Sequence, residues 1–249
     1  SRRFIGDHIL SERDLVEHRH FSDAVAYGGW SLDEHCPGGI ENRDDPPSFF
    51  HYKFSKIYEI PFRSLYSKNI SNLLFAGRNG SQTHIALSST RVLATCALLG
   101  QAAGTGVALC VQKGLGPREV AHQHIEALQE QLLRDDAFIP NRPANDSKDL
   151  ARQAGVVIGH PTRSGDAALL TDGVSRDEDE TLHHWQSADL PAEVWLEWEK
   201  PVSLSCLEIK CDTNVRCNIM MRKTPRTNHT TEVPAELLKS LTAEARVDG

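Results

Sequence analysis

A long segment without charge, Val92 to Val111, constrains the fold of this chain most strongly. Its length of about 20 residues is that of a membrane-spanning helix, and Gly100 and Gly104 have the spacing of a small-residue packing motif. We expect no membrane span, because Gln101 and several alanines lower the transfer energy and no basic flank of the cytoplasmic type adjoins the segment. The segment predicts instead a helix buried on all sides in an α/β core.

The residues before this segment predict a strand that runs into a polar loop. Residues 71–77 (SNLLFAG) are a short apolar run typical of a buried strand. A glycine-containing loop, residues 77–84, follows, and a helix is expected from about Ile85 to Val111. Glycines let a ligand approach closely, and unpaired amides at a helix start carry partial positive charge. Since ligands of α/β sheets bind beyond the carboxyl ends of strands, the loop is a candidate site for an anion or a carbonyl oxygen.

Four neighbouring segments complete the N-terminal half. Ser11 and Asp14 have the spacing of a capping box, which predicts a short helix. Residues 35–52 are rich in Gly, Pro and Asp and predict a long loop. Residues 56–66 predict a strand that ends near Pro61. Residues 115–136 predict one helix with a single apolar stripe and a proline in its first turn, and the preceding Gly114-x-Gly116 predicts a helix stop.

The composition changes after residue 135. Pro, Asn and Asp dominate residues 136–150, which predicts a linker. Beyond it, short alternating segments are divided by turn residues, as in Val194 to Glu199 and around Glu208. This pattern is typical of antiparallel strands with one solvated face, and it predicts a β-sandwich in residues 151–249.

Charge and cysteine usage exclude several functions. The net charge of −7 argues against non-specific binding of nucleic acid. The cysteines form no C-x-x-C pair and have no metal-ligand spacing, so no metal site is expected. Cys96 and Cys110 are expected to be buried and to pack like small apolar residues. Cys206, Cys211 and Cys217 lie close enough in sequence to hold a disulfide, and the sequence does not decide whether they do.

The segment NLLFAGRNGSQTHIALSSTRVLATCALLGQAAGTGVAL closely resembles the C-terminal FAD-contacting segment of the FAD-dependent oxidoreductase family. The upstream segments IGDHILSERDL, GGWSLDEHCPGG and YEIPFRSLY resemble the same family in the same order. The resemblance implies an α/β fold, with residues 1–135 as the C-terminal part of a Rossmann-like FAD/NAD(P)-binding domain. The region 151–249 is similar to the β-domain attached to some of these proteins, a sandwich of the discoidin or carbohydrate-module kind.

The resemblance also assigns residues to the cofactor FAD. Gly77, Arg78 and Asn79 match the Gly-Arg loop that ends the last strand of the dinucleotide domain, beside the ribityl and pyrophosphate part of FAD. The next match is the start of a helix whose amides face the flavin N1 and C2 oxygen, and it comprises Ser88, Ser89, Thr90 and Arg91. A helix dipole at that place favours an anionic reduced flavin.

One departure from the family concerns the other half of the cofactor. The G-x-G-x-x-G that binds the ADP half does not occur in the 249 residues. The chain also begins at Ser1 without Met and stops at Gly249, so we expect a fragment. Such a fragment would hold FAD weakly or not at all, and would be inactive without the missing half.

Three residues are candidates for catalysis, since flavin oxidoreductases need a base for the substrate proton. His84 stands at the head of the flavin helix, where a capping or loop role is the alternative. His35 follows Asp33, which could orient its imidazole, and its alternative is a solvated loop. Arg63 could clamp a carboxylate or a flavin oxygen, and a structural ion pair explains it equally well.

The leading hypothesis is a flavoprotein that transfers hydride from a hydroxylated small molecule, such as a sugar, to flavin. The alternative is a carbohydrate- or partner-binding module without redox activity of its own. Its candidate stacking residues are Trp185, Trp195 and Trp198. Trp195 and Trp198 are an odd number of residues apart, so on one regular strand they would face opposite sides.

Overall fold

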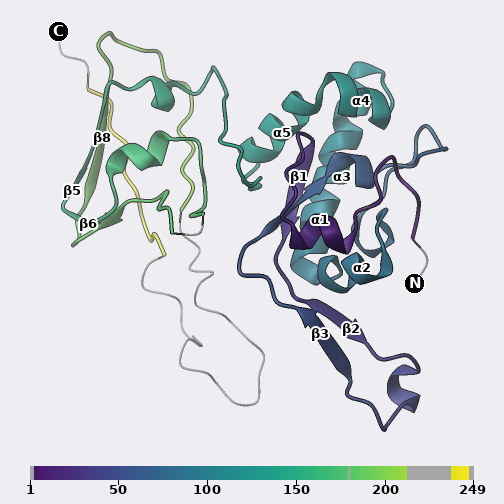
Figure 1. Cartoon of the computed structure of the whole chain (residues 1–249). Helices are drawn as coiled ribbons and strands as arrows, with labels where there is room; N and C mark the ends of the chain where they lie inside the picture. Colours follow the sequence, from purple (N-terminus) through teal and green to yellow (C-terminus); the bar gives the residue numbers. More distant parts are fainter. Residues whose placement is uncertain (1–2, 179, 212–236, 247–249) are drawn as a thin grey trace.

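The structure is a computed structural model that describes residues 3–178, 180–211 and 237–246. Figure 1 shows two groups of elements joined by a segment without helix or strand, residues 136–149. The N-terminal group contains helices α1 to α5 and strands β1 to β4, and the C-terminal group contains strands β5 to β8. The expected linker overlaps the joining segment, while the exact domain boundaries stay a prediction.

The first helix, α1 (Glu12–Val16), begins where the sequence predicts it. The Ser11 hydroxyl accepts from the Asp14 amide, and the Asp14 carboxylate accepts from the Ser11 amide and hydroxyl. The predicted capping box is therefore confirmed. Ahead of the helix, Leu10 forms an isolated parallel bridge with Gln82, and the Phe4 amide donates to the Asn79 carbonyl. These bonds hold the N-terminal residues beside the candidate ligand loop, residues 77–84.

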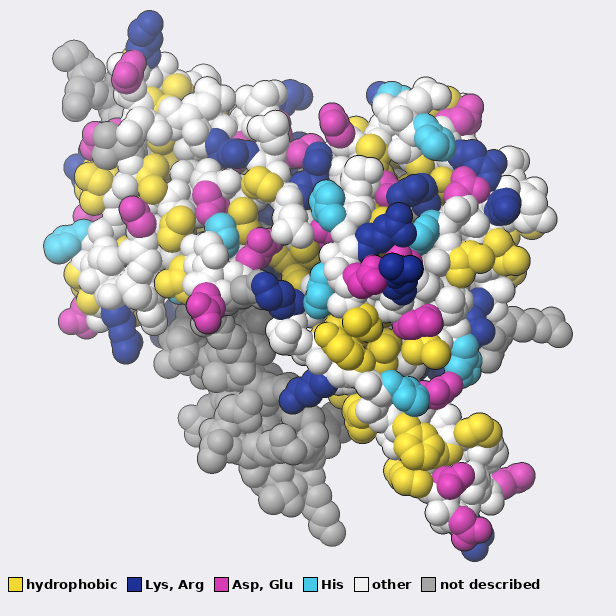
Figure 2. Space-filling model, viewed as in Figure 1, with side chains coloured by type: hydrophobic (Ala, Val, Ile, Leu, Met, Phe, Trp, Pro, Cys, Tyr) yellow, Lys and Arg dark blue, Asp and Glu magenta, His cyan; other side chains and the backbone are white. Residues whose placement is uncertain are grey.

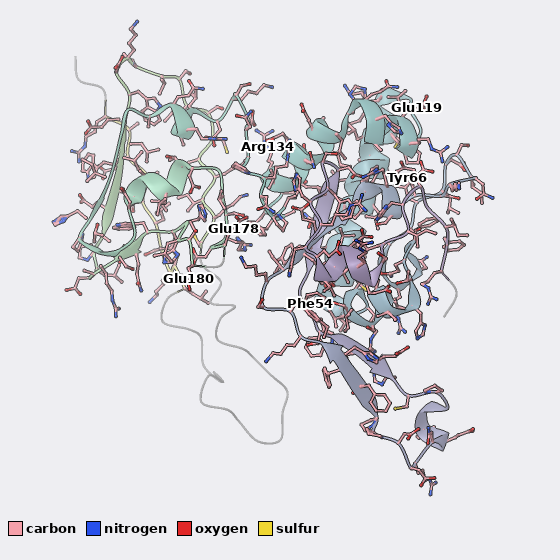
Figure 3. The ribbon with its side chains drawn as sticks, in the orientation of Figure 1. Phe54, Tyr66, Glu119, Arg134, Glu178 and Glu180 are labelled. Atoms are coloured by element: carbon pink, nitrogen blue, oxygen red, sulfur yellow. The ribbon has the colours of Figure 1, made fainter. Side chains whose placement is uncertain are left out.

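The core forms around two paired strands. Strand β1 (Ala24–Gly28) pairs antiparallel with β4 (Tyr58–Pro61), which confirms the predicted strand that ends near Pro61. Helices pack against this pair, and the Gln129 amide group donates to the carbonyls of Ser22 and Ala24. Tyr66, labelled in Figure 3, lies in the same group of elements. The largest fully buried side chains here include Leu10, Leu15, Tyr58, Ile60, Phe62, Leu65, Tyr66, Phe75, Leu99, Leu128 and Leu132.

The strand predicted at residues 71–77 is wrong. Leu74 forms only an isolated bridge with Tyr66, and the chain then enters the 3-10 turn η3 (Gly77–Asn79). The segment folds back on residues just before it, since the Phe75 amide donates to the Leu65 carbonyl. This local pairing takes the place of a longer ladder. The named strands that the structure describes form four two-stranded antiparallel sheets.

The single helix predicted from Ile85 to Val111 is two helices, α2 (His84–Thr90) and α3 (Leu93–Lys113). The break falls at Val92, whose backbone is extended, with φ −68° and ψ 149°. Tertiary bonds hold the end of α2 in place, because the Arg91 guanidinium donates to the Asp33 carbonyl and carboxylate. Asp33 is distant in sequence, and a local pattern contains no signal for such a partner. The pattern therefore predicts one unbroken helix.

The expectation that this helix is buried on all sides is also wrong. Only 28% of the most apolar 18-residue window of α3 is buried. One side of α3 packs into the core through Leu99, Ala102 and Gly106, whereas Leu93 and Val111 on the helix are 89% and 77% exposed. Within the described residues, α3 is the one helix long and apolar enough to cross a membrane, and this property alone is a weak indication.

The helix predicted at residues 115–136 also divides. Helices α4 (Pro117–Gln123) and α5 (Ile125–Arg134) meet at His124, whose φ of −137° is outside the helical range. The apolar stripe is confirmed, because Val120, Leu128 and Leu132 are fully buried. The predicted helix stop is confirmed as well, since Gly114 ends α3 with a φ of 66°, a conformation that favours glycine.

Part of the loop predicted at residues 35–52 is a hairpin. Strand β2 (Leu32–His35) pairs antiparallel with β3 (Ser48–Tyr52), and only residues 36–47 between them form the loop, including the short 3-10 turn η1 (Gly39–Glu41). Figure 1 shows the hairpin projecting from the helices, and Phe54 marks its base in Figure 3. Apolar side chains on the projection are exposed, as the lower part of Figure 2 shows, among them Ile40, Phe49, Phe50 and Tyr52.

The C-terminal group contains two small sheets. Strand β5 (Val156–His160) pairs with β8 (Glu193–Glu197), and β6 (Thr162–Ser164) pairs with β7 (Gln186–Ser187), both antiparallel. Antiparallel pairing is thus present, but a β-sandwich is not confirmed. Residues 200–211 contain no strand, and Leu207 and Ile209 are exposed, so the strand expected around Glu208 is wrong. Cys206 and Cys211 are free thiols, and Cys217 lies outside the described residues.

Candidate functional site

The loop after Phe75 turns sharply against the start of α3. Gly77 has a φ of 76°, and a Cβ atom there would lie 3.6 Å from the Cβ and Sγ atoms of Cys96. The Gly80 amide donates to the Gly77 carbonyl and closes the turn. The side-chain oxygen of Asn79 is buried without a hydrogen-bond partner. An unpaired buried acceptor is costly unless a ligand or water supplies a donor, so Asn79 is a candidate for ligand contact.

Arg78 is the cation of this turn. Its side chain is exposed, and no described residue forms a hydrogen bond or ion pair with it. Arg78 lies close to Cys96 in the first turn of α3. Burial raises the pKa of the Cys96 thiol, and the charge of Arg78 partly opposes this increase. An arginine with unused donors on the surface is suited to binding an anionic group such as a phosphate.

The start of α3 lies beside the same turn. Val92, at the N-cap position, makes no side-chain capping bond, and Leu93 and Ala94 after it are exposed. The first amides of any helix lack acceptors within the helix and carry partial positive charge. The helix N-terminus near Arg78 is therefore at Val92, and the prediction that the helix starts at Ser88 to Arg91 is wrong.

The residues from Ser88 to Arg91 end α2 and bond inside the protein. The Ser88 hydroxyl donates to the Ile85 carbonyl, and the Ser89 hydroxyl bonds with the Tyr58 hydroxyl at 2.5 Å and with the Trp30 carbonyl. The Thr90 hydroxyl bonds with the Gln82 amide oxygen. These side chains fix α2 against the hairpin and β4. Any contact of theirs with FAD stays a prediction.

Two histidines share the carboxylate of Glu34. Nε2 of His84, the first residue of α2, lies 2.8 Å from Oε1 of Glu34. Nε2 of His51 on β3 lies 3.0 Å from Oε2 of the same carboxylate. Sequence reasoning missed His51, because only the register of the hairpin places it diagonally opposite Glu34. The expected pairing of Asp33 with His35 is wrong, since Asp33 bonds with Arg91. His35 is exposed, and no partner of its imidazole is found among the described residues.

Arg63 is held away from this cluster by a buried carboxylate. Its Nε and one terminal nitrogen each donate to Asp23 at 2.9 Å, and its amide donates to the same carboxylate. Asp23 is buried, and its hydrogen bond raises the pKa of Arg63. Of the two interpretations of Arg63, the geometry favours the structural ion pair.

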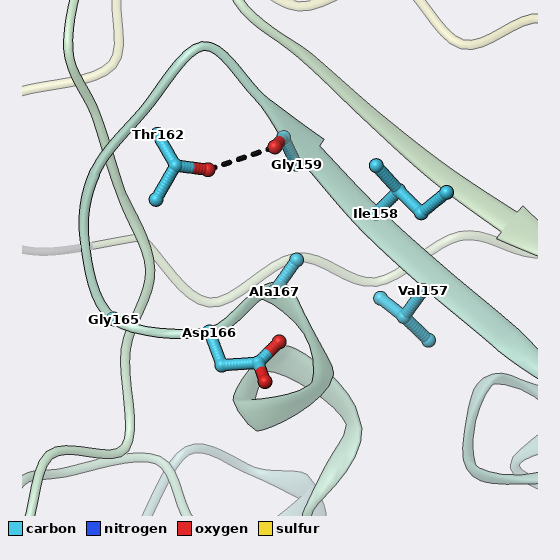
Figure 4. A pocket seen from close by; sticks show the side chains of 7 residues that line it. All are labelled: Val157, Ile158, Gly159, Thr162, Gly165, Asp166 and Ala167. Atoms are coloured by element: carbon cyan, nitrogen blue, oxygen red, sulfur yellow. Dashed lines mark hydrogen bonds between the residues drawn. The ribbon is translucent and has the colours of Figure 1, made fainter.

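A shallow hollow of about 300 Å³ lies in the C-terminal group (Figure 4). Val157, Gly159 and Asp166 contribute to its wall, and the Thr162 hydroxyl donates to the Gly159 carbonyl across it. The indole of Trp185 packs against Gly159 and donates to the Thr162 hydroxyl. Among the residues that the structure describes, no group of three His, Cys, Asp or Glu side chains is arranged to hold a metal ion.

Comparison with known protein families identifies the N-terminal group. The family model "FAD dependent oxidoreductase" matches residues 1–132, which is more than half of the chain. The chain belongs to this family. Membership implies FAD as the cofactor and a Rossmann-like α/β fold for the matched region, although the described strands there pair only as small antiparallel sheets. No curated protein and no solved structure matches the chain.

Proposed function

We propose that the chain serves an FAD-dependent oxidation of a hydroxylated small molecule, with sugars as the first candidates. The observation that carries the proposal is Arg78, an exposed cation without a described partner, beside the uncapped start of α3. Family membership supplies the cofactor, and this turn supplies a place that fits it. The chemistry that FAD provides when bound is acceptance of a hydride from the substrate carbon.

The residues present fit the anionic and polar parts of FAD. Arg78 would hold a phosphate or flavin oxygen, and the first amides of α3, from Leu93 to Thr95, would donate to a carbonyl or anionic oxygen. The unpaired oxygen of Asn79 would accept a donor from the cofactor. The positive φ of Gly77 lets the backbone turn tightly enough to place these groups together.

We further propose that the ADP half of FAD needs residues that this sequence does not contain. No G-x-G-x-x-G occurs in the 249 residues, and the apolar outer side of α3 is uncovered in the described chain. Binding of FAD by this chain alone is therefore expected to be weak. A titration with FMN would distinguish the two halves of the site. FMN keeps the flavin, the ribityl chain and one phosphate and lacks only the AMP portion of FAD, so it should bind this chain with an affinity close to that of FAD.

The test is a fluorescence titration of FAD into the purified chain, with the Arg78→Ala variant alongside. Loss of a charge-assisted contact of about 1.5–3 kcal/mol weakens binding roughly 10- to 100-fold. Arg163→Ala is the matched control, since Arg163 is an exposed arginine in the C-terminal group. An equal loss in both variants, or no FAD binding at millimolar concentration, would contradict the proposal.

The alternative function, a carbohydrate-binding module, would use the C-terminal group. The indole N–H groups of Trp185, Trp195 and Trp198 all donate inside the chain, to Thr162, Glu193 and the Leu150 carbonyl respectively. This leaves their polar edges unavailable to a sugar, so we rank the alternative second. Retention of the chain on immobilised glycans, together with an absence of flavin binding, would reverse the order.

A further inference from the structure

Strand β3 is the outer edge of the projecting hairpin. It pairs antiparallel with β2 on one side, and helix α2 packs against β2. On the other side of β3, no backbone group of another described residue forms a hydrogen bond with the strand. Alternate residues of a strand direct their N–H and C=O groups to opposite sides. The strand therefore presents backbone donors and acceptors that a further strand could bind.

The side chains of this edge strand are largely apolar and exposed. Phe49, Phe50 and Tyr52 are 45%, 63% and 37% exposed, and they belong to the apolar group on the projection in Figure 2. Charged side chains are a common means of keeping an edge strand unpaired. Strand β3 contains no Asp, Glu, Lys or Arg. Neither the backbone nor the charge of β3 itself therefore opposes the addition of a strand.

The hairpin also has a physical reason to gain a strand. A two-stranded sheet is marginally stable in water, and a third strand or a covering helix stabilises it. Helix α2 packs against β2, while the rest of the hairpin projects away from the helices (Figure 1). The outer side of α3 exposes apolar side chains too, but a helix already pairs its own backbone groups. Strand β3 is therefore the better candidate for an interface.

A second copy of the same strand is complementary to this edge. Antiparallel pairing about a two-fold axis at Phe50 would place this residue opposite its counterpart and Ser48 opposite Tyr52 of the other copy. Aromatic pairs across two strands are favourable, and like charges do not meet within the strand. The ladder with β2 shifts its register next to His51, so the central position, Phe50, defines the proposed pairing best.

The residues that flank β3 are complementary in charge. Asp44 and Asp45 precede the strand, and Lys53 follows it. All three are exposed. In an antiparallel pair, the start of one strand lies beside the end of the other, so the acidic end of each copy would approach the basic residue of its counterpart. A parallel pair would instead bring the like charges together.

We propose that β3 is a homodimer interface, at which two copies pair antiparallel through this strand and form a four-stranded sheet. The new strand would bind the free backbone groups of β3 and cover part of its exposed aromatic side chains. Each copy contributes a strand of five residues, so the interface is small and the dimer is weak. This inference goes beyond the proposed oxidation and does not depend on FAD.

The experiment is sedimentation velocity of the full chain without FAD, from micromolar to millimolar concentration. The expected result is a shift from monomer to dimer as the concentration rises. Phe50→Lys and Phe50→Glu each place like charges opposite each other at the axis, and each should weaken dimerisation roughly 100-fold. An equimolar mixture of the two variants should recover the dimer, because opposite charges then face each other.

Ile40→Lys is the matched control, since Ile40 is 95% exposed on the same hairpin but lies outside β3, and it should leave the dimer unchanged. Leu93→Lys examines the outer side of α3 and should also leave it unchanged. Circular dichroism checks that each variant folds. A chain that stays monomeric at millimolar concentration would overturn the proposal. A dimer that Phe50→Lys does not weaken, or a mixture that does not recover it, would overturn it as well.

Discussion

Residues 3–139 and the residues from 150 onward differ in how they are held together. The first region encloses a continuous cluster of buried apolar side chains from α1, β1, β4 and α3 to α5. Of the side chains that the structure describes from residue 150 on, the only buried apolar one is Ala167. Since so few apolar side chains are buried there, the second region gains little free energy of folding from apolar burial. Its two-stranded sheets are also only marginally stable by themselves. The residues that match the family model and the residues that form the buried core are therefore largely the same part of the chain.

The largest effect expected from this difference is at Phe62, whose side chain is fully buried in the first region. Phe62→Ala should lower the free energy of unfolding by about 3–5 kcal/mol, because it removes a large apolar side chain and leaves a cavity. Leu204→Ala is the counterpart at an exposed position in the second region. It should change the free energy of unfolding by less than about 0.5 kcal/mol. Urea denaturation followed by circular dichroism measures both. Equal losses of unfolding free energy in the two variants would contradict the contrast between the regions.

A pair of glycine substitutions tests whether the second region has any tight packing. A Cβ atom on Gly106 would lie 2.8 Å from the Phe62 ring, and one on Gly159 would lie 2.4 Å from the Trp185 ring. Gly106→Ala should destabilise the first region by about 1–3 kcal/mol through overpacking.

Gly159→Ala should destabilise the second region by a similar amount only if the contact with Trp185 is maintained in solution. It should then also shift the fluorescence of Trp185. Gly104→Ala is the control for both, since no atom lies within 4 Å of a Cβ there. It should stabilise α3 by up to about 1 kcal/mol through helix propensity. A stabilising Gly159→Ala would show that the second region is loosely packed.

The smallest expected effect is a change in stability at low pH, and it concerns Asp7. The hydrogen bonds from Arg118 lower the pKa of Asp7 in the first region. A carboxylate with a lowered folded-state pKa stabilises the protein above its unfolded value, near pH 4, and this contribution disappears as the pH falls through the folded pKa. Asp7→Asn should therefore lower stability by up to about 1 kcal/mol at pH 7 and by almost nothing at pH 2. Thermal unfolding at both values measures the difference, and a cost that persists at pH 2 would disagree with it.

The features that the sequence predicts correctly are local ones. The Ser11 capping box, the end of β4 at Pro61 and the glycine stop at Gly114 each depend on residues within one turn of one another. Arg78 lies in the predicted loop, and His84 begins the helix that follows this loop. Local chemistry is sufficient for these features, because the residues that decide them are neighbours in the chain.

The features that the sequence misses depend on distant partners. The break between α2 and α3 is held by Asp33, and the role of His51 depends on the register of β2 and β3. The pairing of Arg63 with Asp23 joins residues 40 positions apart. In the second region, the alternation around Glu208 looks like a strand, but no partner strand is present among the described residues to bury its apolar side.

The uncovered side of α3 has a consequence for the chain as a colloid. Two molecules carrying a net charge of −7 repel each other, and this repulsion opposes contact between exposed apolar positions such as Leu93 and Val111. Salt shortens the range of the repulsion to about 8 Å at physiological ionic strength and about 3 Å at 1 M. Solubility should therefore fall as salt rises, in the opposite sense to a protein whose molecules attract through charge.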